Sequence, residues 1–379
     1  MENTNLLFSK KQIRQITLKN RVAISPMCNY SAKDGFANEW HLVHLGKFAQ
    51  GGAGIVFTEA AAVESTGRIT HGDLGIWSDD HIPGLKQISD FIKTQNCVPA
   101  IQLAHAGRKA SMQRPWHGNG PLDKTDTDRG ENNWNINAPS PIPVGEGFLV
   151  PHELTLDEIK RIQNSWGEAA KRSLSAGFEV IELHGAHGYL GHEFLSPISN
   201  KRTDTYGGSL DGRMRFILET VEILRSSWPQ DKPLFTRISS IDGVEGGWTI
   251  DDSVVLANEL KNRGVDVIDC SSGGIAGSAT AAKIKRGPGF QVPFSERIKH
   301  EVNISTMAVG LIMEPHHAEE ILKDEKADII AVGREALYNP NWALHSEEEL
   351  LGEGEFESWP HQYGWWLDKR NKSLIANKK

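Results

Sequence analysis

Residues 178–190 read Phe-Glu-Val-Ile-Glu-Leu-His-Gly-Ala-His-Gly-Tyr-Leu, a short and largely apolar run followed by two histidines and a tyrosine. A run of this kind suits a strand that is buried on both faces, as the strands of a parallel sheet are. The histidines and the tyrosine then follow the end of that strand, which is the end where parallel barrels place their chemistry.

Similar runs recur along the whole chain. Seven others are short and nearly all apolar: Val22–Ser25, Gly54–Thr58, Ala100–Leu103, Leu234–Ile238, Val265–Cys270, Ile304–Val309 and Asp328–Val332. Helix-like stretches lie between most of them: 41–50, 82–94, 155–173, 210–227, 249–261 and 314–323. Eight strands that alternate with helices predict an α/β fold, a single (β/α)₈ or TIM barrel. An open, doubly wound sheet is the alternative, and it usually has fewer strands.

One connection lacks a clear periodicity. From about 106 to 153 the chain is rich in glycine, proline, asparagine and charge. A loop this long inside a compact domain is usually a lid or binding loop, or else disordered. Because it follows the third strand, we expect it over the mouth of the barrel. We expect one domain over residues 1–379, with this active-site loop and a C-terminal tail from about 352 to 379.

Composition narrows the classes of function. The formal net charge is −8, which argues against nucleic-acid and anionic-membrane partners. Three widely spaced cysteines make a disulfide framework or a zinc cluster improbable and fit a reducing cytosol. The N-terminus lacks the apolar segment of a signal peptide, and no apolar run approaches the ~20 residues of a membrane helix. These features predict a cytoplasmic protein.

His184, His187 and Tyr189 are the candidate catalytic residues. The two histidines share one face if the segment turns helically. Neutral imidazoles can donate hydrogen bonds to a carbonyl or nitro oxygen and stabilise the charge that develops there. A phenol can deliver a proton to a developing carbanion. A metal site is the competing interpretation, although no second histidine pair or carboxylate cluster follows the neighbouring strands.

Three other strand ends carry side chains that could contact a flat, anionic molecule. Cys28 would be a polarisable contact, or else a buried packing cysteine. Gln102 offers donors and an acceptor in a fixed fork that suits an imide-like edge. Arg237 could pair with a structural carboxylate or stabilise a reduced, negatively charged cofactor.

The last two strands end in glycine. Barrel phosphate sites are often built from the loops after strands seven and eight, with backbone N–H groups as donors. Gly310 and Gly333 allow a phosphate to approach closely, and Arg334 adds a bidentate fork. Once a barrel is granted, this pattern predicts a phosphate site.

Motifs spread over most of the chain resemble those of the Old Yellow Enzyme family. Residues 18–21 (LKNR) and 25–28 (SPMC) look like the opening of the family. Residues 184–209, which contain FLSP and NKRTDTYGGS, look like its central signature, and Gly333-Arg334 stands near the end. The cysteine after Ser-Pro-Met, with Tyr30 two residues on, resembles the thermophilic-like bacterial branch. The tryptophan-rich tail resembles xenobiotic reductases of that branch.

The resemblance implies a non-covalently bound FMN. By position, its ligands would be Ser25, Pro26, Met27, Cys28, Ala60, Gln102, Arg237, Gly310, Gly333 and Arg334. Cys28 would contact the flavin and tune its potential. Gln102 would bind the pyrimidine edge, and Arg237 would lie near the part that becomes anionic on reduction.

The resemblance also implies an NAD(P)H-dependent ene-reductase with a ping-pong mechanism. NADPH, or NADH, would reduce FMN, and an activated alkene or nitro compound would then bind under His184 and His187. Hydride would go to the β-carbon and Tyr189 would protonate the α-carbon. By position, the substrate-binding residues would be Tyr30, His184, His187, Lys109 and Trp366. A homo-oligomer, either dimer or tetramer, is expected.

Two departures from the family pattern stand out. Residues 211–213 read Asp-Gly-Arg where the family commonly has Glu-Asn-Arg, and a glycine within a helix costs up to ~1 kcal/mol. Some relatives place an arginine from a neighbouring subunit's tail in the active site, whereas residues 362–367 read QYGWWL. Simple packing of Trp365 and Trp366 against the barrel is the alternative to a role in the pocket.

Three other functions stay open from the residues alone. One is a metal-dependent barrel hydrolase that uses the two histidines. Another is a related FMN dehydrogenase for a different substrate class, although such enzymes carry cysteine-rich iron–sulfur motifs that this chain lacks. The third is a flavin-binding protein with incidental activity, against which Tyr189 argues.

Overall fold

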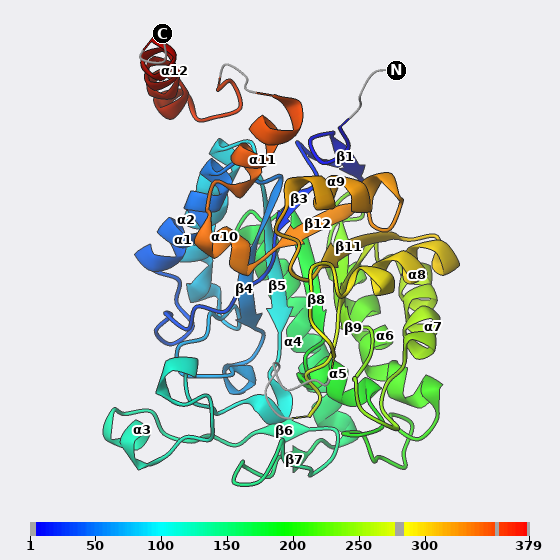
Figure 1. Cartoon of the computed structure of the whole chain (residues 1–379). Coiled ribbons are helices and arrows are strands. Elements are labelled where there is room, and N and C mark those ends of the chain that lie inside the picture. The colour runs from blue at the N-terminus through cyan, green and yellow to red at the C-terminus, as the bar shows by residue number, and fades with distance from the viewer. Residues whose placement is uncertain (1–4, 277–283, 353–355, 377–379) are drawn as a thin grey trace.

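The computed structural model describes residues 5–276, 284–352 and 356–376. Eight parallel strands close into one barrel in the order β10–β11–β12–β3–β4–β5–β8–β9, with helices packed around it (Figure 1). The strands are β3 (Val22–Ile24), β4 (Ile55–Ala62), β5 (Val98–Ala104), β8 (Val180–Gly185), β9 (Leu234–Ser239), β10 (Val267–Ser271), β11 (Ser305–Val309) and β12 (Ile329–Val332). The predicted (β/α)₈ barrel is confirmed, and each predicted strand segment overlaps one of these eight.

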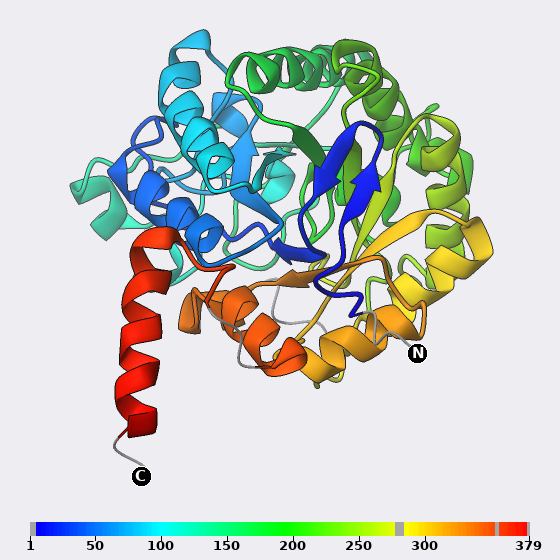
Figure 2. The same ribbon diagram turned by 90° about the horizontal axis from the view of Figure 1, so that it is seen from above.

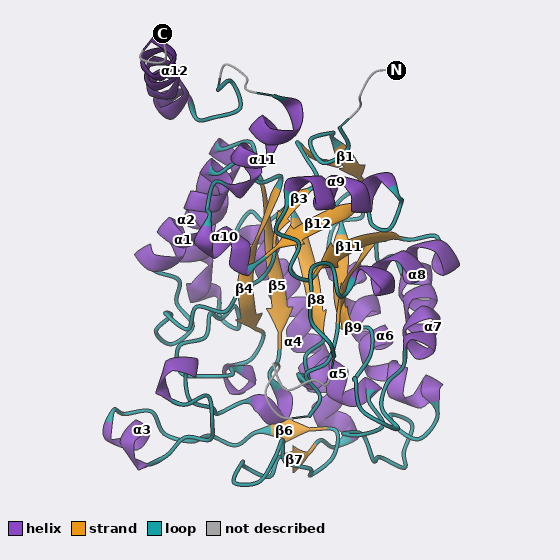
Figure 3. Ribbon diagram, viewed as in Figure 1, coloured by secondary structure: helices purple, strands orange, loops and turns teal. Residues whose placement is uncertain are grey.

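The helices that follow the strands cover the outside of the barrel (Figure 3). They include α1 (Glu39–Gln50), α2 (Ile82–Thr94), α4 (Leu156–Ser175), α6 (Leu210–Ser227), α7 (Ile250–Asn262), α8 (Val292–Val302) and α9 (Pro315–Lys323). Thr155 and Glu158 form a capping box at the start of α4. Gly212 in α6 has a structural reason, because a Cβ there would lie 2.2 Å from the carbonyl oxygen of Gly207.

A hairpin closes the N-terminal end of the barrel (Figure 2). Strands β1 (Lys11–Ile13) and β2 (Ile16–Leu18) are antiparallel. Ile13 and Leu18 belong to the apolar cluster that fills the barrel interior. The turn Arg14-Gln15 contains none of the glycine or asparagine residues that favour a two-residue hairpin, and Arg14 has φ of +51°. The sequence therefore does not predict this hairpin.

The long connection after β5 lies at the opposite, C-terminal end of the strands (Figure 1). It contains only short elements: η3 (Gly107–Lys109), η4 (Pro115–His117), α3 (Lys124–Asp128), β6 (Asn137–Ala138) and β7 (His152–Glu153). Ion pairs join Arg114 to Glu131 and Arg129 to Asp126 within it. The connection thus lies at the mouth of the barrel, as expected from its place after the third strand.

The chain ends with α10 (Arg334–Tyr338), α11 (Trp342–Leu351) and α12 (His361–Ala376). Helix α12 extends away from the barrel at the end opposite to the mouth (Figures 1 and 2). Its side chains include Trp365 and Trp366, which are 58% and 67% exposed. Among the described residues, no helix combines the length and the apolar character that a membrane crossing requires.

Candidate active site

The turn after β8 brings His184, His187 and Tyr189 together. The centroid of the His184 ring lies 5.2 Å from that of His187 and 5.0 Å from that of Tyr189, and both pairs meet edge to face. His184 is buried on the last part of β8, whereas His187 and Tyr189 are partly exposed. The structure thus assembles the three predicted catalytic side chains at the mouth of the barrel.

A network of buried polar groups fixes the backbone of this turn. The amide of His187 donates to Ser239 Oγ at 2.9 Å, and that of Gly188 donates to His192 Nδ1 at 2.9 Å. His192 Nε2 in turn lies 2.7 Å from Asp242 Oδ1, with both side chains inaccessible to solvent. Gly188 has φ of +73°, and a Cβ there would lie 2.2 Å from the carbonyl oxygen of Gly274. Only glycine fits at this position without a shift of the backbone.

The protonation states of the three side chains follow from burial. Burial, followed by the charge of Arg237, lowers the pKa of both His184 and His187 well below the usual range, so both imidazoles are neutral. Burial also raises the pKa of Tyr189 well above its usual value, with Cys28 adding to the effect, so the phenol keeps its proton. The site therefore holds neutral donors at neutral pH.

Hydrogen bonds constrain where the imidazole protons lie. His184 Nδ1 accepts from the amide of Ala186 at 3.3 Å, which places the proton on Nε2. His187 Nε2 lies 2.6 Å from Ser271 Oγ. If the Ser271 hydroxyl donates to Nε2, His187 carries its proton on Nδ1.

Lys109 belongs to the same site, although much of its bonding is with the backbone. Its Nζ donates to the carbonyl oxygen of His187 at 2.8 Å and to that of Gly274. Nζ also lies 5.7 Å from the centroid of the Tyr189 ring. Burial, then the charge of Arg108, lowers the pKa of Lys109 to about 7. Lys109 therefore ties the histidine turn to the loop after β10.

Cys28 and Tyr30 lie on the loop after β3 and face the same apolar cluster as Tyr189. Glu59 positions this loop, because its Oε2 accepts from the amide of Asn29 at 3.0 Å and from that of Tyr30 at 3.4 Å. Tyr30 adopts φ of +50° here. Burial, followed by Glu59, raises the pKa of the Cys28 thiol well above its usual range, so this thiol is neutral.

A pocket of about 350 Å³ at the ends of β3, β11 and β12 suits a phosphate. Ser25, Met27, Gly310, Gly333 and Arg334 are among the residues that line it. A Cβ at Gly333 would meet no atom closer than 3.8 Å, so the backbone there is open to a ligand. Glycine turns beside a guanidinium fit the phosphate of FMN.

The floor of the mouth suits the pyrimidine end of a flavin. Gln102 Nε2 donates to Glu182 Oε1 at 2.8 Å, which orients the amide. Arg237 Nη1 donates to Ser25 Oγ at 3.3 Å, and its Nε lies 3.1 Å from Asp269 Oδ2. An oriented amide and a neighbouring guanidinium match an imide edge that can become anionic. Ala60, on β4, lines a small cavity together with Tyr189.

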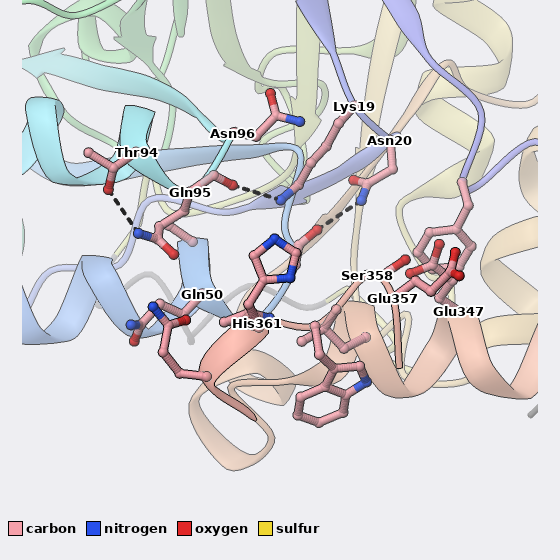
Figure 4. Close-up of a pocket in the computed structure, with 17 residues that line it drawn as sticks. Lys19, Asn20, Gln50, Thr94, Gln95, Asn96, Glu347, Glu357, Ser358 and His361 are labelled. Carbon is pink, nitrogen blue, oxygen red and sulfur yellow. Dashed lines mark hydrogen bonds between the residues drawn. The ribbon is translucent and has the colours of Figure 1, made fainter. Parts of the chain in front are cut away.

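One predicted site residue is not brought to the mouth. Trp366 lies on α12 at the other end of the molecule and is exposed. A second pocket, of about 580 Å³, is lined by Lys19, Asn20 and His361 among others, at the N-terminal end of the barrel (Figure 4). It is remote from the histidines and shares none of the predicted site residues.

The described residues offer little support for a metal at the histidine pair. Only one group of three potential ligands occurs among them, formed by His117, Asp126 and Glu131 in the long connection. Arginines already pair with both carboxylates of that group. His184 and His187 belong to no such group in the described part of the chain.

The sequence did not point to a role for Glu182 and Asp269, which lie inside the barrel beneath the mouth. Both side chains have no solvent-exposed area. The sequence feature that could have indicated a role is a carboxylate within an otherwise apolar strand, two residues before the polar residue at the end of that strand.

The comparisons with known proteins agree with this geometry. The sequence model of the NADH:flavin oxidoreductase / NADH oxidase family matches residues 6–353. An NADPH dehydrogenase of Geobacillus sp. (strain WCH70) is 43% identical over 362 residues, which are 95% of this chain and 98% of that protein. An NADPH dehydrogenase of Bacillus cytotoxicus is 45% identical over 373 residues, 98% of each chain. A solved structure of morphinone reductase in complex with tetrahydroNAD superposes with a TM-score of 0.74 at 25% sequence identity. The match covers 91% of this chain and 91% of that chain.

Proposed function

The chain belongs to the NADH:flavin oxidoreductase / NADH oxidase family, and it is an NAD(P)H-dependent flavin oxidoreductase with FMN as cofactor. From this premise we propose that the enzyme is an ene-reductase. Its substrates are α,β-unsaturated carbonyl or nitro compounds, and it reduces their C=C bond. The family-level resemblance predicted from the sequence is thereby confirmed, whereas the substrate class is our proposal.

The observation that carries the proposal is the group of two neutral imidazoles and a protonated phenol at the mouth of the barrel. The rings of His184 and His187 meet edge to face, and the ring of Tyr189 also meets that of His184 edge to face. Two N–H donors can bind one carbonyl or nitro oxygen, and they bind it more strongly as that oxygen gains charge. A protonated phenol beside them can give its proton to the neighbouring carbon.

The FMN supplies the hydride chemistry, and the chain supplies orientation and the proton. Ser25, Gly310, Gly333 and Arg334 would hold the phosphate, and Gln102 and Arg237 would hold the pyrimidine end. His184 Nε2–H and His187 Nδ1–H bind the oxygen of the substrate, the latter when Ser271 donates to Nε2. Tyr189 Oη–H then gives its proton to the α-carbon.

We further propose that the enzyme is a homo-oligomer in which Trp366 lines the pocket of a neighbouring copy. Helix α12 leaves its own barrel, and its two tryptophans are largely exposed. A Trp366 that contacts substrate must therefore contact the substrate of another copy. The exposed aromatic pair, with ring centroids 4.6 Å apart, suits such an apolar contact.

Anaerobic half-reactions test the proposal. NADPH should bleach the flavin, and 2-cyclohexenone should restore its colour. In Tyr189→Phe the bleaching should keep its rate, whereas reoxidation should slow by about 10²–10⁴-fold, the usual worth of a general acid. An enone that reoxidises the wild type no faster than buffer does, or a Tyr189→Phe variant with an unchanged second half-reaction, contradicts the proposal.

A further inference from the structure

Four polar side chains lie inside the barrel directly beneath the mouth. They are Gln102 on β5, Glu182 on β8, Arg237 on β9 and Asp269 on β10. Gln102 pairs in register with Glu182, and Arg237 pairs with Asp269. The most exposed of the four, Arg237, has only 6% of its surface accessible. Below them the barrel is filled by apolar side chains, so this layer is enclosed.

The layer contains two carboxyl groups and one guanidinium. Arg237 Nε lies 3.1 Å from Asp269 Oδ2, and Gln102 donates to Glu182 Oε1. Within the described ranges, Glu182 Oε2 and both oxygens of Asp269 accept no hydrogen bond. A buried charge without hydrogen-bond partners is costly, so the layer does not carry two full negative charges.

Charge balance identifies which carboxyl group is protonated. Burial, then the nearby Asp269, raises the pKa of Glu182 well above its usual range. Burial raises the pKa of Asp269 as well. The charge of Arg237 opposes the rise for both groups, but within the described ranges only Asp269 forms an ion pair with the guanidinium. Glu182 therefore holds a proton and Asp269 is the counter-ion of Arg237. At the mouth above the layer, His184 and His187 are neutral. The Tyr189 phenol and the Cys28 thiol keep their protons. Lys109, whose pKa is lowered to about 7, is a further titratable group there.

We propose that Asp269 takes up a proton from solution when the bound FMN accepts a hydride. A hydride brings two electrons and one proton, so the flavin gains one negative charge near Arg237. The guanidinium then compensates that charge, and Asp269 loses part of its counter-ion. A proton from water forms an O–H bond on the Asp269 carboxylate, and the oxidised nicotinamide leaves. The net charge of the enclosed layer with its cofactor is thus unchanged.

Asp269 is a positioning residue in this scheme, because it acts on the flavin through Arg237. The inference rests on FMN and NAD(P)H but not on the proposed alkene chemistry. An experiment that ends with the reduced flavin therefore tests the proton uptake by Asp269 separately from the alkene chemistry. A failure to reduce enones would not contradict the proton uptake.

The direct test counts protons. Holoenzyme is mixed anaerobically with one equivalent of NADPH in dilute buffer that contains a pH indicator. We expect the wild type to take up one proton per flavin and Asp269→Asn to take up none. Glu182→Gln is the matched control, since its amide replaces a carboxyl group that is already neutral, and it should keep the uptake. No uptake by the wild type, or full uptake by Asp269→Asn, overturns the proposal.

The midpoint potential gives a second readout that needs no turnover. In the wild type the midpoint potential should decrease as pH rises, with the slope expected for two protons per two electrons. In Asp269→Asn the slope of midpoint potential against pH should be half as large. If Asp269→Asn fails to bind FMN, the wild type alone decides. A two-proton slope with the absorption spectrum of an anionic reduced flavin supports uptake by the protein. A one-proton slope, or the spectrum of a neutral reduced flavin, refutes it.

Discussion

Burial sets the chemistry of single residues at the mouth. His184 is neutral because it is enclosed and faces the charge of Arg237, and its Nδ1 already accepts from the backbone. Its Nε2–H is therefore the donor left for an anionic oxygen. Hydrogen bonds to charged groups contribute about 1.5–3 kcal/mol, so the loss of this donor should be measurable in binding.

His184→Ala should weaken the binding of a phenolate ligand by about 10–100-fold. The measurement is a titration of the holoenzyme with 4-hydroxybenzaldehyde, followed by the change in flavin absorbance. His300→Ala, an exposed histidine on α8, is the control and should bind as the wild type does. Equal affinities for both variants would show that His184 does not hold the oxygen.

Lys109 should make stability depend on pH in a defined direction. Its pKa is lowered from 10.5 to about 7 in the folded protein, mainly by burial. Between these two values the unfolded chain binds a proton that the folded chain does not, so stability rises with pH across this window. The free energy of unfolding should therefore increase more between pH 7 and 9 in the wild type than in Lys109→Met. The free energy of unfolding is measured by urea denaturation of the holoenzyme. An equal increase in the wild type and in Lys109→Met would contradict the lowered pKa of Lys109.

The sequence predicts which residue types gather at the mouth, but not how each is used. His184, His187 and Tyr189 could be proposed as a group because they stand at the end of one strand in a recognisable order, and their catalytic roles stay a prediction. Glu182 could not be assigned a role, since only the barrel shows that its side chain meets Gln102 in an enclosed layer. Lys109 was expected to line the site, and the structure adds that it bonds to two backbone carbonyl groups.

At the scale of elements, Gly212 shows that packing can outweigh helix propensity. Alanine at a helix position is about 1 kcal/mol more favourable than glycine when its side chain is free. In α6 the added Cβ would lie 2.2 Å from the carbonyl oxygen of Gly207, which is backbone and cannot swing away. The glycine that departs from the family pattern is therefore required by the turn that precedes α6.

Gly212→Ala should lower the free energy of unfolding by about 1–3 kcal/mol, the usual cost of overpacking. Urea denaturation with saturating FMN is the measurement. Ser226→Ala, at an exposed position near the end of the same helix, should change stability little. If Gly212→Ala is more stable than the wild type, the propensity term prevails and the steric argument is wrong.

The barrel strands can be predicted from the sequence more readily than the β1–β2 hairpin. The eight barrel strands are buried on both faces, so they appear as apolar runs. The β1–β2 hairpin buries only Ile13 and Leu18, and its turn begins at Arg14 with a positive φ, so neither pattern nor turn residues predict it. Elements that depend on contacts with distant parts of the chain cannot be predicted from the local sequence pattern.

The whole molecule has two ends with different tasks. The mouth carries the histidine turn and the residues proposed to hold FMN, while the other end carries the hairpin and α12. The barrel follows from the repeated alternation of strands and helices, which is a property of the chain as a whole. The position of Trp366 does not follow, because a helix that leaves its own barrel shows no sequence signal for the surface that it contacts.

Removal of residues 353–379 should therefore reduce the proposed homo-oligomer to smaller species and raise KM for the enone, while the rate of flavin reduction by NADPH stays unchanged. The exposed Trp365 and Trp366 would bury a large apolar area against a neighbouring copy, and truncation deletes that area. Light scattering gives the mass, and steady-state kinetics give KM. Trp366→Ala separates the two effects: it should raise KM while the mass is retained. A truncated protein with the original mass and KM would show that α12 contacts no neighbouring copy and that Trp366 lines no pocket.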